Sequence, residues 1–266
     1  MPQVQGSTTK YLVRAGWSDV PHLTEKAKAE LLAAYQPHMR AARTRGEPVL
    51  GSGLIFPIDE ALITCAPAPI PKHWARLASL DFGWEHSTAV TWLAHDRDPD
   101  TVYVYDVHRA ALTLIPVHAA AINTRPGGKW IPVAWPHDGY QVKDAMHGEQ
   151  LAQQYRDHGV LMREEHAHFE ETPVVAEQER STISTEAGIQ AILTRMTLGK
   201  FKVFAHLEPW FEEFRMYHRK EGLIVKERDD LMSATRIGIM DLRHAITEPA
   251  AGRGIDHNRR SDGLYS

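Results

Sequence analysis

From residue 76 onward, hydrophobic and polar positions follow a regular pattern that predicts alternating strands and helices. The three apolar runs that come first are separated by short polar connections, which are typical of antiparallel neighbours. The predicted order is strands at 76–82, 88–95 and 101–108, a helix at 116–124, a strand at 130–135, a helix at 148–158 and a strand at 160–163. This order predicts an α/β domain in which an antiparallel meander continues into parallel strands, forming a mixed central sheet flanked by helices.

The chain before residue 73 lacks this regular alternation of predicted strands and helices. It begins with a possible strand at 10–14 and an amphipathic helix at 25–35 with Thr24 as its N-cap, and it continues into segments rich in glycine and proline. We therefore expect residues 1–72 to form an arm or linker, residues 73–248 to form the main domain, and residues 249–266 to form a flexible tail.

Composition limits the possible functions. With 266 residues, of which 43% are hydrophobic, the chain can bury a large core, while its net charge of -4 means that any contact with nucleic acid must come from a local basic patch. The single cysteine, Cys65, excludes an internal disulfide and a cysteine zinc site, and it fits a reducing compartment. No apolar run approaches the roughly 20 residues of a membrane span, so we expect the protein to work inside a cell.

Two aspartates follow predicted strands and precede glycines. Asp81 ends the strand at 76–82, and Asp138 comes shortly after the strand at 130–135. A right-handed crossover would place these strands side by side and parallel, so both carboxylates would leave the same edge of the sheet. Neighbouring strands lie about 4.8 Å apart, a spacing that lets two carboxylates share metal ions. An Asx turn at each strand exit is the alternative explanation.

A third acidic position is expected at residues 229 and 230. Two Mg²⁺ ions need further oxygen ligands, and Asp229 and Asp230 open an amphipathic helix. The apolar positions that would place this helix against the sheet are Leu231, Ala234, Ile237 and Leu242. We favour Asp230 over Asp229 as the ligand, while helix capping and a favourable dipole interaction offer an alternative role for both residues.

Other side chains are candidates for supporting roles. Glu85, His86 and His137 lie close in sequence to the strand-end aspartates and could orient them. A local positive surface for a phosphate backbone could come from Lys143, Arg215, Arg219 and Lys220. An aromatic group at helical spacing, Trp210, Phe211, Phe214 and Tyr217, is expected to be core.

Together these motifs resemble the C-terminal nuclease part of the large terminase subunit of tailed bacteriophages, which has a ribonuclease H-like fold. The matching stretches are residues 17–23, 48–57, 80–84, 138–139 and 229–234. The resemblance implies an endonuclease that cuts concatemeric double-stranded viral DNA with two divalent metal ions, Mg²⁺ or Mn²⁺. It also implies that Asp81, Asp138 and the pair Asp229 and Asp230 hold these ions. Many members of the family carry a further aspartate where this chain has Ser233.

The resemblance also suggests partners. They would be double-stranded DNA, the terminase ATPase region, the small terminase subunit and the portal protein, all in the cytoplasm of the host cell. No phosphate-loop motif occurs in the sequence, so we expect a nuclease fragment without ATPase activity, whose residues 1–72 follow the ATPase region. A Holliday-junction resolvase, an integrase-like nuclease and a non-catalytic ribonuclease H-like docking module are the alternatives.

Overall fold

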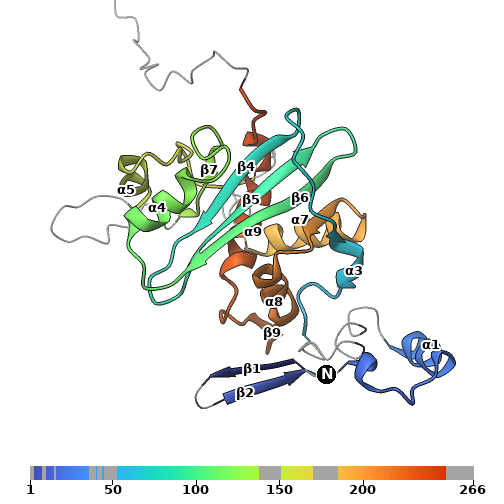
Figure 1. Ribbon diagram of the computed structural model, residues 1–266. Helices are drawn as coiled ribbons and strands as arrows, with labels where there is room; N and C mark the ends of the chain where they lie inside the picture. Colours follow the sequence, from blue (N-terminus) through green and yellow to red (C-terminus); the bar gives the residue numbers. More distant parts are fainter. Residues whose placement is uncertain are drawn as a thin grey trace, which may run out of the picture.

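A six-stranded mixed sheet forms the centre of the computed structural model, which describes residues 3–7, 10–14, 16–35, 40, 44, 53–137, 151–169 and 185–249 (Figure 1). The strands run in the order β3-β8-β6-β5-β4-β7. Their bounds are β3 Thr64–Cys65, β4 Ala75–Asp81, β5 Thr88–Asp96, β6 Thr101–Ala110, β7 Val133–Ala134 and β8 Phe201–Phe204. The three central strands are antiparallel, whereas β7, β8 and β3 pair in parallel. The predicted mixed sheet is confirmed.

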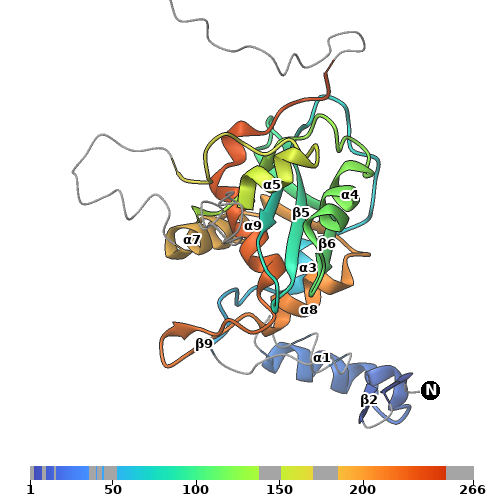
Figure 2. The same ribbon diagram turned by 90° about the vertical axis from the view of Figure 1, so that its left-hand side faces the viewer.

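Helices cover both faces of the sheet, as the view along its edge shows (Figure 2). Their bounds are α3 Glu60–Ile63, α4 Ile115–Asn123, α5 Leu151–Asp157, α7 Thr185–Thr197, α8 Glu208–Met216 and α9 Asp230–Met240. The strict alternation along β5 assigns the faces, because Val90 and Trp92 pack with α4 and α5, whereas Ala89 and Leu93 pack with α7, α8 and α9. Successive residues of β5 therefore serve two separate cores.

Two predicted strands are shorter than expected. The strand predicted at 130–135 is reduced to β7, and the one at 160–163 is a single bridge between Val133 and Met162. Pro132 has no N–H to donate, and only its carbonyl joins the ladder, accepting from the backbone nitrogen of Ala78 at 2.9 Å. The parallel pairing between β4 and β7 is consequently held by few hydrogen bonds.

The segment just before residue 72 belongs to the main domain, which corrects the expected boundary. Ile55, Phe56 and Ile63 are buried in the core on the α8 side, and β3 forms the edge strand of the sheet. The backbone nitrogen of Ile55 also donates to the carbonyl of Tyr217 at 3.0 Å. The glycines and prolines around residues 46–71 led us to expect a linker, but the apolar residues among them pack into the domain.

The beginning of the chain contains the two elements that the sequence predicted. They are the strand β2 Lys10–Arg14, which forms a hairpin with β1 Gln3–Ser7, and the helix α1 Glu25–Ala34. Thr24 caps α1, since its hydroxyl accepts from the backbone nitrogen of Ala27 at 3.3 Å. The predicted tail at 249–266 lies, apart from its first residue, outside the described residues.

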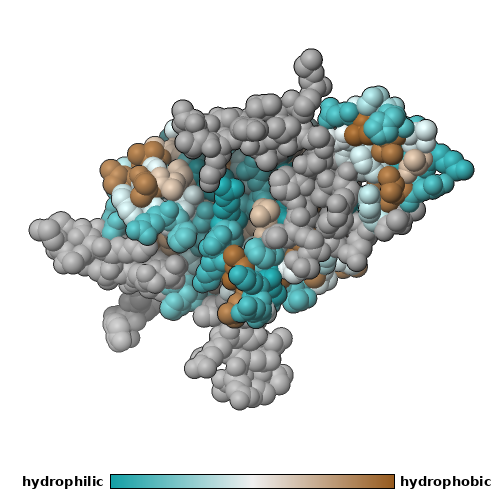
Figure 3. All heavy atoms as spheres, turned by 90° about the horizontal axis from the view of Figure 1, so that it is seen from below, coloured by the Kyte–Doolittle hydropathy of each residue, from teal (hydrophilic) through white to brown (hydrophobic). Residues whose placement is uncertain are grey.

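Most large apolar side chains are buried in the cores on the two faces of the sheet, and the predicted aromatic group at Trp210, Phe211, Phe214 and Tyr217 is among them. On the face seen in Figure 3, the described residues are mainly hydrophilic, with hydrophobic side chains in small separate groups. None of the helices that the structure describes is long and apolar enough to span a membrane.

Candidate active site

Asp81 leaves the sheet on the side that α9 covers. It is the last residue of β4 and lies opposite Ala89 of β5, which lies opposite Arg109 of β6. Residues directly opposite each other share a face of the sheet, and so do residues two apart in one strand. Ser79 on this face lies so close to α9 that a Cβ on Gly238 would be 2.6 Å from its Oγ atom. The glycine thus allows the close approach that brings α9 to Asp81.

The start of α9 is capped by a residue from another helix. Asp229 occupies the N-cap position but makes no side-chain capping hydrogen bond. Instead, the carboxylate of Glu213 on α8 accepts from the backbone nitrogens of Leu231 at 2.7 Å and Met232 at 3.3 Å. These are the N–H groups that an N-cap side chain normally satisfies. The capping role that could have explained Asp229 is therefore filled by Glu213.

Glu213 is itself buried and paired with Arg109, the β6 residue in the same row as Asp81. Burial raises the pKa of Glu213 to about 7, although Arg109 and the N–H of Leu231 act to lower it. The Arg109 guanidinium also acts to lower the pKa of Asp230. Arg109 thus links the sheet, the cap of α9 and the acidic pair electrostatically.

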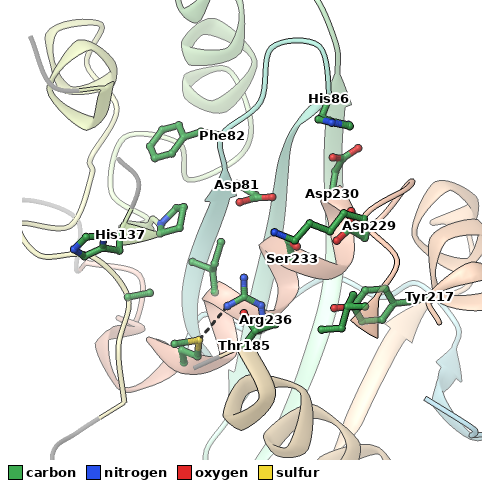
Figure 4. A pocket seen from close by; sticks show the side chains of 16 residues that line it. Asp81, Phe82, His86, His137, Thr185, Tyr217, Asp229, Asp230, Ser233 and Arg236 are labelled. Carbon is green, nitrogen blue, oxygen red and sulfur yellow. Dashed lines mark hydrogen bonds between the residues drawn. The ribbon is translucent and has the colours of Figure 1, made fainter. Parts of the chain in front are cut away.

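The three acidic residues open into one cavity of about 470 Å³ (Figure 4). Its polar lining residues are Asp81, His86, His137, Thr185, Tyr217, Lys226, Asp229, Asp230, Ser233 and Arg236. Positions 229, 233 and 236 share a face of α9, because residues three, four and seven apart lie above one another on a helix. One face of α9 therefore supplies much of the cavity wall opposite the end of β4.

Asp229 and Asp230 lie in an environment that disfavours their charge. Burial raises the pKa of both carboxyls, and the negative charge of Asp230 raises that of Asp229 further. Lys226 and His86 act to lower the pKa of Asp229, while Arg109, His86 and Ser87 act to lower that of Asp230, without offsetting burial. A bound cation would remove this repulsion and restore the charged forms.

The structure places only some of the predicted ligands. Asp81, Asp229 and Asp230 line the same cavity, and His137 lines it too, but Asp138 falls outside the described part of the chain. In that part, no three His, Cys, Asp or Glu side chains are grouped closely enough to hold a metal ion. The described residues therefore supply part of the predicted ligand set.

Among the predicted supporting residues, His86 and His137 line this cavity, whereas Glu85 lines a neighbouring one of about 810 Å³ with Trp84. Sequence reasoning did not single out Tyr217, Lys226 or Arg236 as site residues. The spacing from Asp229 through Ser233 to Arg236 was the available signal for Arg236, because it places all three on one helix face.

The predicted basic surface is wrong for Arg215. This side chain is buried and forms ion pairs with Glu60 at 2.8 Å and Glu208 at 2.8 Å, so its role is structural. Arg219 is paired with Glu186 at 2.6 Å, and Lys220 is exposed beside it on β9 Arg219–Lys220, which pairs with β10 Leu223–Ile224. Lys143 lies in a stretch that the structure does not describe.

Comparisons with known proteins agree with this arrangement. Residues 78–242 match the family model described as a terminase RNaseH-like domain. Over 228 residues the chain is 41% identical to the large terminase subunit of Salmonella phage P22, an alignment that covers 85% of this chain and 43% of that protein. The large terminase subunit of Enterobacteria phage LP7 is also 41% identical, over 84% of this chain and 44% of its own length. The chain thus spans less than half the length of either relative.

Solved structures of large terminases also superpose on this chain. The nuclease domain of the P22 large terminase superposes with a TM-score of 0.63 at 41% sequence identity, covering 74% of this chain and 96% of that domain. The large terminase of a thermophilic bacteriophage superposes with a TM-score of 0.53 at 16% identity, covering 84% of this chain and 54% of that one. The second likeness concerns the fold alone.

Proposed function

The chain belongs to the large terminase subunits with a ribonuclease H-like domain, and we propose that this domain is a metal-dependent endonuclease acting on double-stranded DNA. The observation that carries the proposal is the convergence of Asp81, from a strand end, with Asp229 and Asp230, from a helix start, on one polar cavity. In DNA packaging, such a domain would cut concatemeric viral DNA when the filling of a procapsid begins and ends.

The residues present fit divalent cations with a preference for oxygen ligands. Asp81, Asp229 and Asp230, joined by Asp138, would hold two ions, Mg²⁺ or Mn²⁺. Asp229 and Asp230 are partly buried, and the positive side chains near them do not offset the effect of burial on their pKa values. A bound divalent cation would compensate their negative charge, which supports this assignment. When bound, such ions lower the pKa of a water molecule and stabilise the leaving 3′ oxygen of a phosphodiester.

The chain's own contribution is positioning. Glu213 holds the first turn of α9, and with it Asp229 and Asp230, against the end of β4. His86, an exposed residue of the β4–β5 connection, acts to lower the pKa of both aspartates and so favours their charged forms. The carboxylates are therefore presented from rigid elements and not from a loop alone.

The wider assembly follows from the family. We infer that the N-terminal residues that precede the main domain follow the ATPase region of a longer subunit, and that this subunit works with the small terminase subunit and the portal protein. The place of action would be the cytoplasm of the infected host cell.

Nicking of supercoiled plasmid in Mn²⁺ or Mg²⁺ tests the proposal. Wild-type protein should nick the plasmid, and Asp81→Asn or Asp138→Asn should slow nicking about 100-fold or more while leaving the fold intact. Asp98→Asn, in the exposed β5–β6 turn, is the matched control and should cut at the wild-type rate. No metal-dependent nicking by wild-type protein would favour a docking module, and a strong preference for four-way junctions would favour a resolvase.

A further inference from the structure

Arg236 is a cation that lines the acidic cavity and has no part in holding the proposed metal ions. It lies on α9, six residues after Asp230, and lines the cavity together with Ser233 (Figure 4). Six residues of α-helix correspond to about 9 Å along the axis, and the Nη1 atom of Arg236 donates toward Met240, one turn further from Asp230. Arg236 therefore lines the same cavity as the acidic pair without being one of its ion-pair partners among the described residues.

Arg236 differs from the other half-buried or buried arginines after residue 53 because, among the described residues, its guanidinium donates to no oxygen acceptor. Its Nε atom is buried without a hydrogen bond, and its only hydrogen bond among the described residues is a weak one from Nη1 to the sulfur of Met240, at 3.6 Å. The other half-buried or buried arginines described after residue 53 each donate to a carboxylate or a backbone carbonyl. They are Arg76, Arg109, Arg125, Arg156, Arg163, Arg195, Arg215, Arg219 and Arg243.

Packing against α7 fixes where this side chain goes. Gly188 of α7 lies directly against the aliphatic part of Arg236, and a Cβ at that position would clash with the Cγ atom of the arginine. The aliphatic part of the Arg236 side chain is thus packed between α9 and α7, and the residue lines the cavity. A side chain held in this way loses little conformational entropy when it binds a ligand.

On the basis of the proposed nuclease function, we propose that Arg236 binds a phosphate group of the DNA backbone inside this cavity. A guanidinium offers a planar fork of donors that matches phosphate oxygens, and among the described residues Arg236 donates only weakly, to the sulfur of Met240. Neutralisation of Asp81, Asp229 and Asp230 by divalent cations would leave Arg236 and Lys226 as the positive groups facing the strand. Arg236 then serves as the residue that places the DNA strand against the acidic site.

The salt dependence of DNA binding tests this inference without cleavage. Binding of a fluorescent duplex is measured by anisotropy in Ca²⁺, with gel analysis to verify that the duplex stays intact. Each phosphate contact adds about 0.9 to the slope of log K against log salt concentration. Arg236→Gln should therefore reduce the slope by about 0.9 and weaken binding about 10-fold, equally for unrelated sequences.

Two further variants make the result decisive. Lys129→Gln removes one positive charge from an exposed position outside the cavity and should keep the wild-type slope. Arg236→Lys retains the charge and should keep most of the slope. A wild-type slope and affinity in Arg236→Gln would overturn the inference, and so would an equal loss in Arg236→Lys accompanied by a lowered melting temperature, which indicates a structural role.

The DNA-binding test of Arg236 and the nicking test of the proposed nuclease function can fail independently. Plasmid nicking by wild-type protein together with unchanged DNA binding by Arg236→Gln would overturn only the role of Arg236. A reduced slope in Arg236→Gln without any nicking by wild-type protein would support phosphate binding and contradict the nuclease. Absence of measurable DNA binding by wild-type protein would overturn the phosphate site, whatever the nicking assay shows.

Discussion

The Oε2 atom of Glu213 lies 2.7 Å from the backbone nitrogen of Leu231, so a carboxylate of α8 caps the helix that carries the acidic pair. This arrangement separates two tasks that adjacent aspartates at a helix start usually combine. Because Glu213 supplies the capping hydrogen bonds, Asp229 makes none. The pair at 229 and 230 is thereby left facing the cavity.

Loss of the Glu213 carboxylate should destabilise the domain. Glu213→Ala would leave the buried N–H groups of Leu231 and Met232 without an acceptor and Arg109 without its ion-pair partner. We expect the free energy of unfolding to fall by about 3 kcal/mol, measured by urea denaturation. Glu212→Ala changes the exposed neighbour and should cost under about 0.5 kcal/mol. Equal losses in both variants would contradict the capping role.

The raised pKa of Glu213 predicts a definite pH dependence of stability. Its carboxyl has a pKa of about 7 in the folded protein and an ordinary value of 4.5, so the folded state binds the proton more tightly. Proton binding by Glu213 therefore contributes to the free energy of unfolding. This contribution, up to about 3 kcal/mol, is fully present below pH 4.5 and is lost as the pH rises through 7. Urea denaturation of wild type and Glu213→Gln between pH 4.5 and 8 should show a stability difference that moves against wild type as pH rises. A constant difference would contradict the assignment.

Much of this arrangement could be predicted from sequence, because it depends on local patterns. The apolar run that ends at Asp81 predicted the strand β4, and the spacing of Leu231, Ala234 and Ile237 predicted the buried face of α9. The Glu213 cap could not be predicted, since it joins residues 18 apart through tertiary packing. The ion pairs of Arg215 were missed for the same reason: no local pattern distinguishes a surface arginine from one that folds onto Glu60.

Metal binding should stabilise the folded protein through the acidic pair. At about 100 times Kd, Mn²⁺ should raise the free energy of unfolding by about 2.7 kcal/mol, visible as a higher Tm. Asp230→Asn should lose most of this gain, and Asp229→Asn should be at least as stable as wild type without metal, because it removes a buried charge next to Asp230. Asp98→Asn should keep the full gain. Undiminished gains in both site variants would exclude the pair as ligands.

The close approach of α9 to the sheet should depend on Gly238. In Gly238→Ala, the added Cβ would lie 2.6 Å from the Oγ atom of Ser79 and 2.5 Å from a methyl group of Leu93, so the helix must move. We expect a loss of about 1 to 3 kcal/mol in stability and slower nicking, because Asp229 and Asp230 move with the helix. The double variant Ser79→Gly/Gly238→Ala relieves part of the clash and should recover part of the loss. A Gly238→Ala protein as stable and active as wild type would contradict this packing.

In the proposed nuclease, Asp81 and the pair Asp229 and Asp230 hold divalent metal ions in one cavity. The most direct test is anomalous scattering from crystals of this protein soaked in Mn²⁺. We expect anomalous peaks inside the cavity, within about 2.0 to 2.3 Å of carboxylate oxygens of Asp81 and of Asp229 or Asp230. Mn²⁺ bound only elsewhere on the protein, with the cavity free of peaks at saturating metal, would contradict it.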